Sequence, residues 1–157
     1  LTIMAGGDKD AFNKANTTMK CYAKFTKLMG SSGSGQLTKM VNQICIAGLV
    51  QGLAEGINFS EKAGLVTEEV IEVISKGAAQ SWQMDNRWAT MSQDHYDHGF
   101  AVDHMRKDLN IAIQEAKKQG ASLEITKLID KFYEDIQNMG GSRWDTSSLL
   151  KRLQNND

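Results

Sequence analysis

The hydrophobic positions of residues 36–63 recur at a helical spacing that covers nearly every side of one long segment. They are Leu37, Met40, Val41, Ile44, Ile46, Leu49, Val50, Leu53 and Ile57. A helix that is apolar all round is typical of a buried position, so this pattern predicts the central helix of a helical domain. A glycine-serine loop at residues 30–35 leads directly into this helix, and Gly64 is the expected C-cap after its end near Ala63.

The first 29 residues show a different pattern. Residues 1–5 form a short apolar run before a two-glycine turn, and residues 24–29 alternate between polar and apolar side chains, so both indicate strands. Asp8 is a good N-cap for a helix over residues 9–22 between them. These residues therefore predict a β-α-β unit, the closing unit of an α/β domain. A chain that starts inside such a unit, without methionine, is expected to be the interior of a longer protein.

From residue 36 onward nearly all of the chain is predicted to be helical, which makes the expected fold class mainly α. The absence of proline from the sequence agrees with this class. Thr67 is the expected N-cap of the helix over residues 68–76, and Gly120 is the expected C-cap of the helix over residues 100–118. Asp145 or Thr146 is the expected N-cap of the last helix. The predicted helices after the central one cover residues 68–76, 78–92, 100–118, 122–138 and 147–153. The apolar side of helix 122–138 is expected to carry Leu123, Ile125, Leu128, Ile129, Phe132 and Ile136.

Lys39, Asn42 and Gln43 are polar interruptions near the start of the otherwise apolar central helix. Helical spacing places Lys39 and Gln43 on one face with Ile46 and Val50. The positive end of the helix dipole and partial burial both disfavour a charged lysine there, which suits Lys39 to proton transfer near neutral pH. The alternative is structural: Lys39 extends to solvent, and Asn42 and Gln43 are ordinary polar neighbours. Spacing alone does not separate the two readings.

Two stripes of unusual composition mark further helix faces. On the side of the central helix opposite Lys39, glycine recurs every four residues, at Gly48, Gly52 and Gly56. Small residues let another helix approach closely, so we expect a helix to pack on this face. The helix over residues 78–92 carries a second stripe, typical of a core or a subunit interface, which consists of Trp82, Met84, Trp88 and Met91.

Composition and charge narrow the class of protein. The 157 residues are 41% hydrophobic and 24% charged, which is ordinary for a globular domain with its own core. A net charge of -1 does not favour a general binder of nucleic acid or of anionic membranes. Gln43, Gln51 and Glu55 interrupt the longest apolar run, so we expect no membrane span. Two cysteines make no disulfide framework; Cys45 is expected in the core, and the cytoplasm is the expected location.

A polar loop at residues 94–99 contains side chains of the kinds that bind metal ions. They are Asp94, His95, Asp97 and His98, followed closely by Asp103 and His104. Adjacent loop ligands rarely complete a coordination shell without more distant partners, so no metal site is predicted.

The helix predicted over residues 100–118 presents a second candidate position for binding. Phe100 and Lys107 are seven residues apart and therefore share one face of a helix. The structural reading of Lys107 is an ion pair with Asp103, which precedes it by one helical turn and contributes roughly a few tenths of a kcal/mol.

The glycine-serine loop and the start of the central helix form the most specific motif in the chain. Residues 30–43 read Gly-Ser-Ser-Gly-Ser-Gly-Gln-Leu-Thr-Lys-Met-Val-Asn-Gln. This segment resembles the Gly-x-x-Gly-x-Gly-x-x-x-Lys-x-x-Asn-Asn/Gln segment of the β-hydroxyacid dehydrogenases, a family that includes 3-hydroxyisobutyrate dehydrogenase, tartronate semialdehyde reductase and the glyoxylate/succinic semialdehyde reductases. Residues 1–8 resemble the last large-strand turn of that family's cofactor domain, residues 100–109 its Phe-to-Lys-Asp-Leu helix, and residues 141–149 its closing Gly-x-x-x-Asp-x-Ser-x-Leu segment. The resemblance covers almost the whole chain with its spacings intact.

The resemblance implies a two-domain enzyme of which this chain holds one part. In the family, a Rossmann domain binds NAD or NADP. An all-helical C-terminal domain of the 6-phosphogluconate dehydrogenase-like type, built around one long central helix, closes the cleft and forms the homo-dimer or tetramer. Residues 1–29 would be the incomplete end of the Rossmann domain, and residues 30–157 the helical substrate and dimerisation domain. The Gly-x-Gly-x-x-Gly fingerprint does not occur in the sequence, so we expect the main cofactor site to lie outside it and the chain alone to be inactive.

The resemblance also assigns roles to residues near the start of the central helix. Lys39 matches the catalytic lysine, the general acid/base that exchanges a proton with the substrate hydroxyl. Asn42 and Gln43 match the amide pair that orients the substrate, although many relatives have two asparagines there. Gly33 and Gly35 would let the backbone approach the substrate closely.

Phe100 and Lys107 receive a role in cofactor binding from the same resemblance. Phe100 matches the aromatic residue that lines the nicotinamide-ribose edge, and Lys107 matches the lysine that closes over it. The implied function is an NAD(P)-dependent oxidoreductase that interconverts a small β-hydroxyacid and its semialdehyde or oxo acid. Two alternatives stay open. One is a non-catalytic dimerisation module on the same helical fold, and the other is a helical binding domain unrelated to dehydrogenases, which requires four accidental motif matches.

Overall fold

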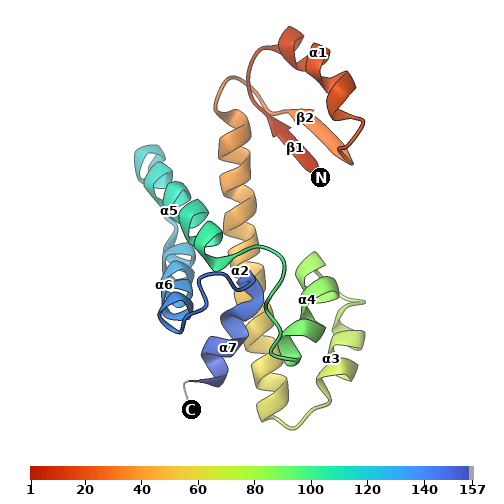
Figure 1. The fold of residues 1–157 in the computed structure, drawn as a ribbon, viewed down its shortest axis with the longest axis vertical. Coiled ribbons are helices and arrows are strands. Elements are labelled where there is room, and N and C mark those ends of the chain that lie inside the picture. The colour runs from red at the N-terminus through yellow and green to blue at the C-terminus, as the bar shows by residue number, and fades with distance from the viewer. Residues whose placement is uncertain (156–157) are drawn as a thin grey trace. The chain divides into compact units, whose positions relative to one another are not determined.

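The computed structural model describes residues 1–155 and shows a mainly helical chain with one small parallel sheet (Figure 1). The expected fold class, mainly α around one long helix after a β-α-β unit, is confirmed. The elements in chain order are β1 (Thr2–Ala5), α1 (Lys9–Met19), β2 (Phe25–Leu28), α2 (Ser34–Lys62), α3 (Thr67–Ile74), α4 (Trp82–Ser92), α5 (Val102–Gln119), α6 (Glu124–Asn138), the 3-10 helix η1 (Thr146–Ser148) and α7 (Leu149–Gln154).

The chain forms two compact units that divide inside α2. The N-terminal unit comprises residues 1–43, and the helical unit begins at Ile44. The domain boundary expected between residues 29 and 30 stays a prediction.

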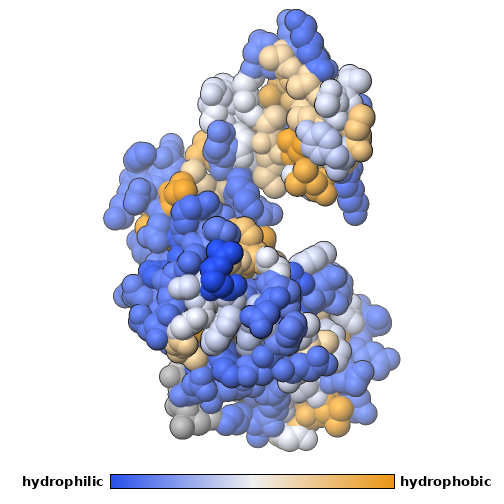
Figure 2. All heavy atoms as spheres, in the orientation of Figure 1, coloured by the Kyte–Doolittle hydropathy of each residue, from blue (hydrophilic) through white to orange (hydrophobic). Residues whose placement is uncertain are grey.

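The N-terminal unit starts with the β-α-β arrangement predicted from the sequence. β1 and β2 pair in parallel, with Thr2 opposite Phe25. Asp8 caps α1, because its Oδ1 accepts a hydrogen bond from the Ala11 N–H at 2.8 Å. Figure 2 shows hydrophobic patches over this unit, whose exposed large apolar side chains are Leu1, Tyr22, Phe25, Met29, Leu37 and Val41.

α1 is shorter than predicted, since it ends at Met19 instead of residue 22. The Lys24 N–H already donates to the Leu1 carbonyl oxygen at 2.8 Å. Because pairing with the first strand begins there, the residues between Met19 and Lys24 have to form the turn that returns the chain to the sheet.

α2 is the predicted central helix, and Gly64 follows its end in a left-handed conformation with a φ of 73°, as expected of a C-cap. Only one stripe of α2 contributes to the core, namely Ala47, Val50, Leu53, Ala54 and Ile57. Other apolar side chains of the helix are exposed, among them Leu37, Val41, Leu49 and Phe59. Cys45, which was expected in the core, is exposed as well. The expectation of a helix buried on all sides is therefore wrong for this chain, because other helices cover only part of its circumference.

By length and composition, α2 is long and apolar enough to cross a membrane, contrary to the expectation that its polar residues exclude this. It is the one such helix among residues 1–155. The core helix of a soluble protein passes the same test, and α2 supplies the buried stripe just described. Its composition alone therefore does not indicate a membrane span.

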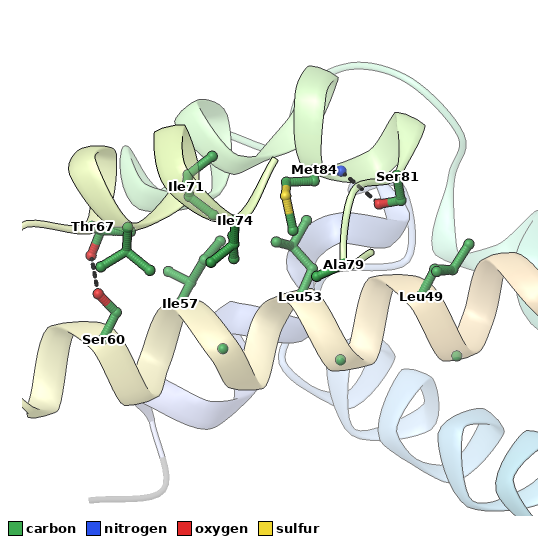
Figure 3. Close-up of a pocket in the computed structure, with 14 residues that line it drawn as sticks. Leu49, Leu53, Ile57, Ser60, Thr67, Ile71, Ile74, Ala79, Ser81 and Met84 are labelled. Carbon is green, nitrogen blue, oxygen red and sulfur yellow. Dashed lines mark hydrogen bonds between the residues drawn. The ribbon is translucent and has the colours of Figure 1, made fainter. Parts of the chain in front are cut away.

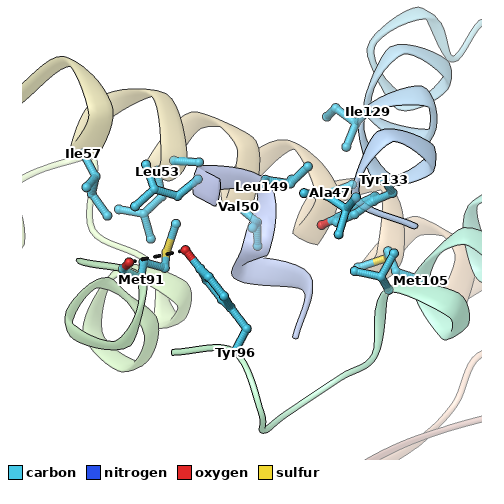
Figure 4. Packing of buried hydrophobic residues seen from close by; sticks show 14 of the residues in the cluster. Ala47, Val50, Leu53, Ile57, Met91, Tyr96, Met105, Ile129, Tyr133 and Leu149 are labelled. Atoms are coloured by element: carbon cyan, nitrogen blue, oxygen red, sulfur yellow. Dashed lines mark hydrogen bonds between the residues drawn. The ribbon is translucent and has the colours of Figure 1, made fainter. Parts of the chain in front are cut away.

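The core of the helical unit gathers side chains from all helices from α2 to α7 (Figure 4). Tyr96 reaches into this cluster, where its hydroxyl donates to the Met91 carbonyl oxygen at 3.3 Å. Tyr133 is fully buried and donates to the Thr146 carbonyl oxygen at 3.1 Å. Burial raises the pKa of both tyrosine hydroxyls, so both remain neutral donors.

α5 and α6 pack together through a polar bridge as well as through the core. The guanidinium of Arg106 lies 3.2 Å from Asp130 and 3.2 Å from Glu134, and its hydrogen bond to Asp130 raises the pKa of Arg106 further. The predicted apolar side of α6 is partly wrong, because Ile125 and Leu128 are exposed. The residues that α6 buries are Thr126, Ile129, Tyr133 and Ile136.

The helices α4, α5 and α6 start later than the sequence predicted, whereas α3 starts one residue earlier, at Thr67. Val66 occupies the N-cap position of α3 without a side-chain hydrogen bond, while Thr67, the expected cap, has its hydroxyl 3.1 Å from that of Ser60. α4 begins four residues late behind Ser81, whose Oγ accepts from the Met84 N–H at 3.1 Å. α5 and α6 each begin two residues late. A side chain that can act as a cap does so only where the approaching backbone presents the N–H groups to it.

Two isoleucines of α6 test which face of this helix is packed. Ile129 is 1% exposed and Ile125 is 65% exposed. We expect Ile129→Ala to lower the free energy of unfolding by about 2–5 kcal/mol through the cavity it creates. The matched variant Ile125→Ala should stay within about 0.5 kcal/mol of the wild type. Urea unfolding followed by far-UV circular dichroism measures both, and equal losses would contradict the packing.

Candidate active site

The glycine-serine loop connects β2 to α2, and it packs the start of α2 against the end of β1. Gly33 has a φ of 96°, which side chains rarely adopt, so glycine is needed at the turn into the helix. Gly35 is buried, and a Cβ at this position would overlap the carbonyl oxygen of Met4 in β1. The Gly7 N–H donates to the Gly30 carbonyl oxygen at 2.9 Å. The backbone on either side of the loop is therefore fixed where α2 begins.

Lys39, Asn42 and Gln43 form a hydrogen-bonded cluster near the start of α2. The Lys39 Nζ donates to Gln43 Oε1 at 2.7 Å, and the Asn42 Nδ2 donates to the same oxygen at 2.8 Å. Gln43 is 2% exposed and Asn42 is half-buried, whereas Lys39 is exposed. The partial burial expected for Lys39 is therefore wrong for this chain, since its side chain extends from the helix with only the amine returning to Gln43.

This cluster can keep the Lys39 amine in place whether the amine is neutral or protonated. Gln43 Oε1 is an acceptor, so it accepts an N–H from Lys39 whether the amine is neutral or charged. A neutral amine can take a proton from a hydroxyl, and the ammonium can return one. The chemical capacity of the cluster is thus reversible proton transfer at a fixed position.

Phe100 lies in the segment before α5, because this helix begins at Val102 and not at residue 100 as predicted. The residue is 38% exposed, and the centroid of its ring lies 5.8 Å from that of His104. The Phe100 N–H donates to Asp145 Oδ2 at 2.8 Å, and its carbonyl oxygen accepts from the Thr146 N–H at 2.9 Å. Both backbone polar groups of Phe100 are therefore bound to the start of η1, while part of the ring stays accessible.

Lys107 lies on the exposed side of α5, with its amine 3.1 Å from Asp108 Oδ1. The structure does not show the structural alternative for Lys107, an ion pair with Asp103. The Lys107 amine pairs with Asp108, and Asp103 Oδ1 accepts from the Gln137 Nε2 of α6 at 2.6 Å. Asp108 was not among the candidate residues. The signal that could have found it is its place beside Lys107 in the Lys-Asp-Leu motif.

Asp145 has a larger role than the helix cap that the sequence predicted. Its side chain is 1% exposed and does cap η1, since Oδ1 accepts from the Ser147 N–H at 3.1 Å. It also accepts from the Ser147 Oγ at 2.6 Å, the Arg87 Nε at 3.2 Å and the Phe100 N–H. Gly99 has a φ of 71°, and a Cβ there would overlap the Asp145 carboxylate. The backbone before α5 therefore wraps closely around this carboxylate.

The structure places the candidate residues in two groups. The group in the N-terminal unit consists of Gly33, Lys39, Asn42 and Gln43. The group in the helical unit consists of Phe100 and Lys107, together with Asp108 and Asp145. Within residues 1–155 no cluster of three or more His, Cys, Asp or Glu side chains is arranged to hold a metal ion. In the 94–99 loop, the rings of His95 and His98 lie 5.3 Å apart, and Asp94 pairs with Lys151.

An apolar groove of about 380 Å³ lies between the glycine face of α2 and the helices α3 and α4 (Figure 3). Ile57, Ile71 and Met84 point into it, and no charged side chain lines it. A Cβ added at Gly48, Gly52 or Gly56 would meet no atom of the described residues within 4 Å, apart from those of adjacent residues and of its own helix. The expectation that a helix packs on these glycines is therefore wrong within residues 1–155. The methionine and tryptophan stripe of α4 is only partly buried, since Met84 and Met91 are buried and Trp82 is exposed.

Comparison with known proteins identifies the family. Residues 33–153 match a protein-family model described as "NAD-binding of NADP-dependent 3-hydroxyisobutyrate dehydrogenase". Because this match covers more than half of the chain, the chain belongs to the 3-hydroxyisobutyrate dehydrogenase family. The resemblance to the β-hydroxyacid dehydrogenases that the motifs indicated is confirmed.

Individual relatives agree with this assignment. An uncharacterized oxidoreductase of Shewanella frigidimarina is 58% identical over 154 residues, which cover 98% of this chain and 53% of the relative. The 2-hydroxy-3-oxopropionate reductase of Escherichia coli is 30% identical over the same coverage of 98% and 53%. A solved structure of 3-hydroxyisobutyrate dehydrogenase from Mycobacterium tuberculosis with L-serine shares the fold, with a TM-score of 0.87 at 22% identity over 97% of this chain and 54% of that one. The chain thus spans about half the length of the curated relatives it matches.

The close contact of Gly35 with β1 gives a test of the loop geometry. We expect Gly35→Ala to destabilise the N-terminal unit by about 1–3 kcal/mol, because the new Cβ forces α2 away from the Met4 carbonyl oxygen. Faster amide hydrogen exchange at Gly7 and Met29 would report this change. The exposed neighbour serves as control, and Gln36→Ala should leave exchange at both amides unchanged. Wild-type protection in Gly35→Ala would contradict the contact.

Proposed function

We propose that the complete protein containing this chain is an NAD(P)-dependent oxidoreductase that interconverts a small β-hydroxyacid and its semialdehyde or oxo acid. Lys39 acts as its general acid/base. The observation that carries the proposal is the amine of Lys39, held 2.7 Å from a buried amide oxygen inside the motif that resembles the β-hydroxyacid dehydrogenases. Membership of the 3-hydroxyisobutyrate dehydrogenase family and a relative named 2-hydroxy-3-oxopropionate reductase support this class of substrate.

The proposed step for Lys39 is a single proton transfer. During oxidation the neutral Lys39 amine takes the proton of the substrate hydroxyl, and during reduction the ammonium returns a proton to the oxygen of the former carbonyl. Gln43 keeps the amine in position in both states, and Asn42 holds the Gln43 amide through their hydrogen bond. Gly33 leaves the turn before the helix without a side chain, which gives a small acid access to the backbone there.

The second group of residues fits a nicotinamide dinucleotide. The accessible part of the Phe100 ring offers an apolar surface to an aromatic ring, and the exposed ammonium of Lys107 offers a cation to ribose hydroxyls or phosphate. The carboxylate of Asp108 limits how far that ammonium can move. A bound NAD or NADP supplies the hydride acceptor or donor for the substrate carbon.

Replacing Lys39 tests the acid/base role. In the complete protein we expect Lys39→Met to lower kcat by roughly 10²- to 10⁴-fold, because the amine proposed to take the hydroxyl proton is removed. The KM for NAD(P) and the far-UV circular dichroism spectrum should change little, since the side chain is exposed and outside the core. Nicotinamide absorbance with a panel of small β-hydroxyacids, tried with NAD and with NADP, measures the rates.

The matched control for this variant is another exposed lysine. Lys127 lies on α6 and belongs to neither group of candidate residues, so Lys127→Met should keep the wild-type kcat. Wild-type turnover in Lys39→Met would contradict the acid/base role. Loss of turnover in both variants would show that the effect is not specific to Lys39.

We also propose that the helical unit forms homo-dimers or tetramers through the apolar groove. The groove is uncharged, and its glycines leave open space that no helix within residues 1–155 fills. Apolar surface of this kind favours burial against a partner. The same observation favours the alternative function, a non-catalytic dimerisation module, which predicts assembly without any NAD(P)-dependent turnover.

Light scattering after size-exclusion chromatography tests the assembly. We expect the wild-type protein to have the mass of a dimer or larger, and Gly52→Leu to shift it toward the monomer, because the leucine fills the groove from within. Leucine is a better helix former than glycine, so α2 itself should persist. Lys127→Leu, which adds the same side chain to the exposed side of α6, should leave the mass unchanged. A monomeric wild type, or an unchanged mass for Gly52→Leu, contradicts the proposal.

A further inference from the structure

Phe100 is held through its backbone, and its ring also lies beside that of His104, with 5.8 Å between the two centroids. The residue is 38% exposed, so its surroundings leave part of it accessible. Its N–H, in contrast, donates to Asp145 Oδ2 at 2.8 Å, and its carbonyl oxygen accepts from the Thr146 N–H at 2.9 Å. Ala101 and Asp145 continue this contact as an antiparallel bridge. The residue that presents the ring is therefore bound on both sides to one short segment.

The Asp145 carboxylate is itself held by groups from outside that segment. Arg87 of α4 donates its Nε to Oδ1 at 3.2 Å, whereas the Phe100 N–H binds Oδ2. A hydrogen bond to a buried carboxylate is stronger than one to a neutral amide oxygen. The backbone at Gly99 lies so close to the carboxylate that a Cβ there would overlap Asp145 Oδ2.

From this geometry we infer that Asp145 is a positioning residue for NAD(P) binding, which acts by holding the backbone of Phe100. The inference rests on the proposed function, in which the Phe100 ring contacts the cofactor. Asp145 is fully enclosed by protein and does not reach the cofactor itself. Its replacement should therefore weaken binding of the nucleotide while leaving proton transfer at Lys39 in place.

Two variants of the complete protein test this role from opposite sides. Asp145→Asn removes the charge that the Phe100 N–H binds, and Gly99→Ala pushes the backbone away from the carboxylate. We expect each to raise the KM for NAD(P) roughly tenfold with kcat changed by less than about twofold, which corresponds to loss of one charge-assisted hydrogen bond in positioning. Hydrogen exchange of the peptide covering residues 96–102 should become faster in both.

Asp130→Asn is the matched control, because Asp130 is another carboxylate 3.2 Å from an arginine Nε, on α6. It should keep the wild-type KM for NAD(P). A folded Asp145→Asn protein with wild-type KM overturns the inference, as does an equal rise in KM for Asp130→Asn, which would indicate general loss of stability. If Asp145→Asn does not fold, Gly99→Ala decides in the same way.

The outcome also separates this inference from the proposed function. If the wild-type protein oxidises no β-hydroxyacid of the panel with NAD or NADP, the proposed function fails. Equilibrium binding of NAD(P) to the wild type and to Asp145→Asn, followed by quenching of tryptophan fluorescence, then tests Asp145 alone. A roughly tenfold weaker Kd supports the positioning role, and an equal Kd or no binding overturns it.

Discussion

Hydrogen bonds to the buried carboxylate of Asp145 connect separate parts of the helical unit. A charge that is 1% exposed is tolerated only when hydrogen-bond donors surround it, and here they come from Arg87, Phe100 and Ser147. These donors belong to α4, to the segment before α5 and to η1. One side chain therefore joins three parts of the chain at the point where α5 begins, and the position of Phe100 follows from that junction.

In the N-terminal unit, backbone geometry and not a buried charge fixes the start of a helix. Gly33 permits the turn into α2, and Gly35 lets the helix approach the Met4 carbonyl oxygen. Lys39 then lies close behind the turn, with its amine directed to Gln43. In both units the candidate residues stand near the start of a helix whose first residues contact neighbouring backbone.

Glycine C-caps were predictable from the sequence, whereas the N-cap of α3 and the long-range contacts were not. Gly64 and Gly120 end helices as expected, because a left-handed C-cap is decided by the residue itself. The exposure of Cys45 and Ile125 was predicted wrongly, since periodicity gives the apolar faces of a helix but not which of them meets another helix. Asp145 was identified only as a cap. Its partners Arg87 and Phe100 are 58 and 45 residues away, and no spacing rule connects them.

The central claim is that the amine at residue 39 transfers a proton, and chemical rescue tests it most directly. Lys39→Ala removes the amine, and small primary amines of different basicity can then be added to the complete protein during turnover of a β-hydroxyacid. The account predicts that turnover is lost in the variant and restored in proportion to amine concentration, more strongly for more basic amines. Turnover close to that of the wild type without any added amine would contradict it.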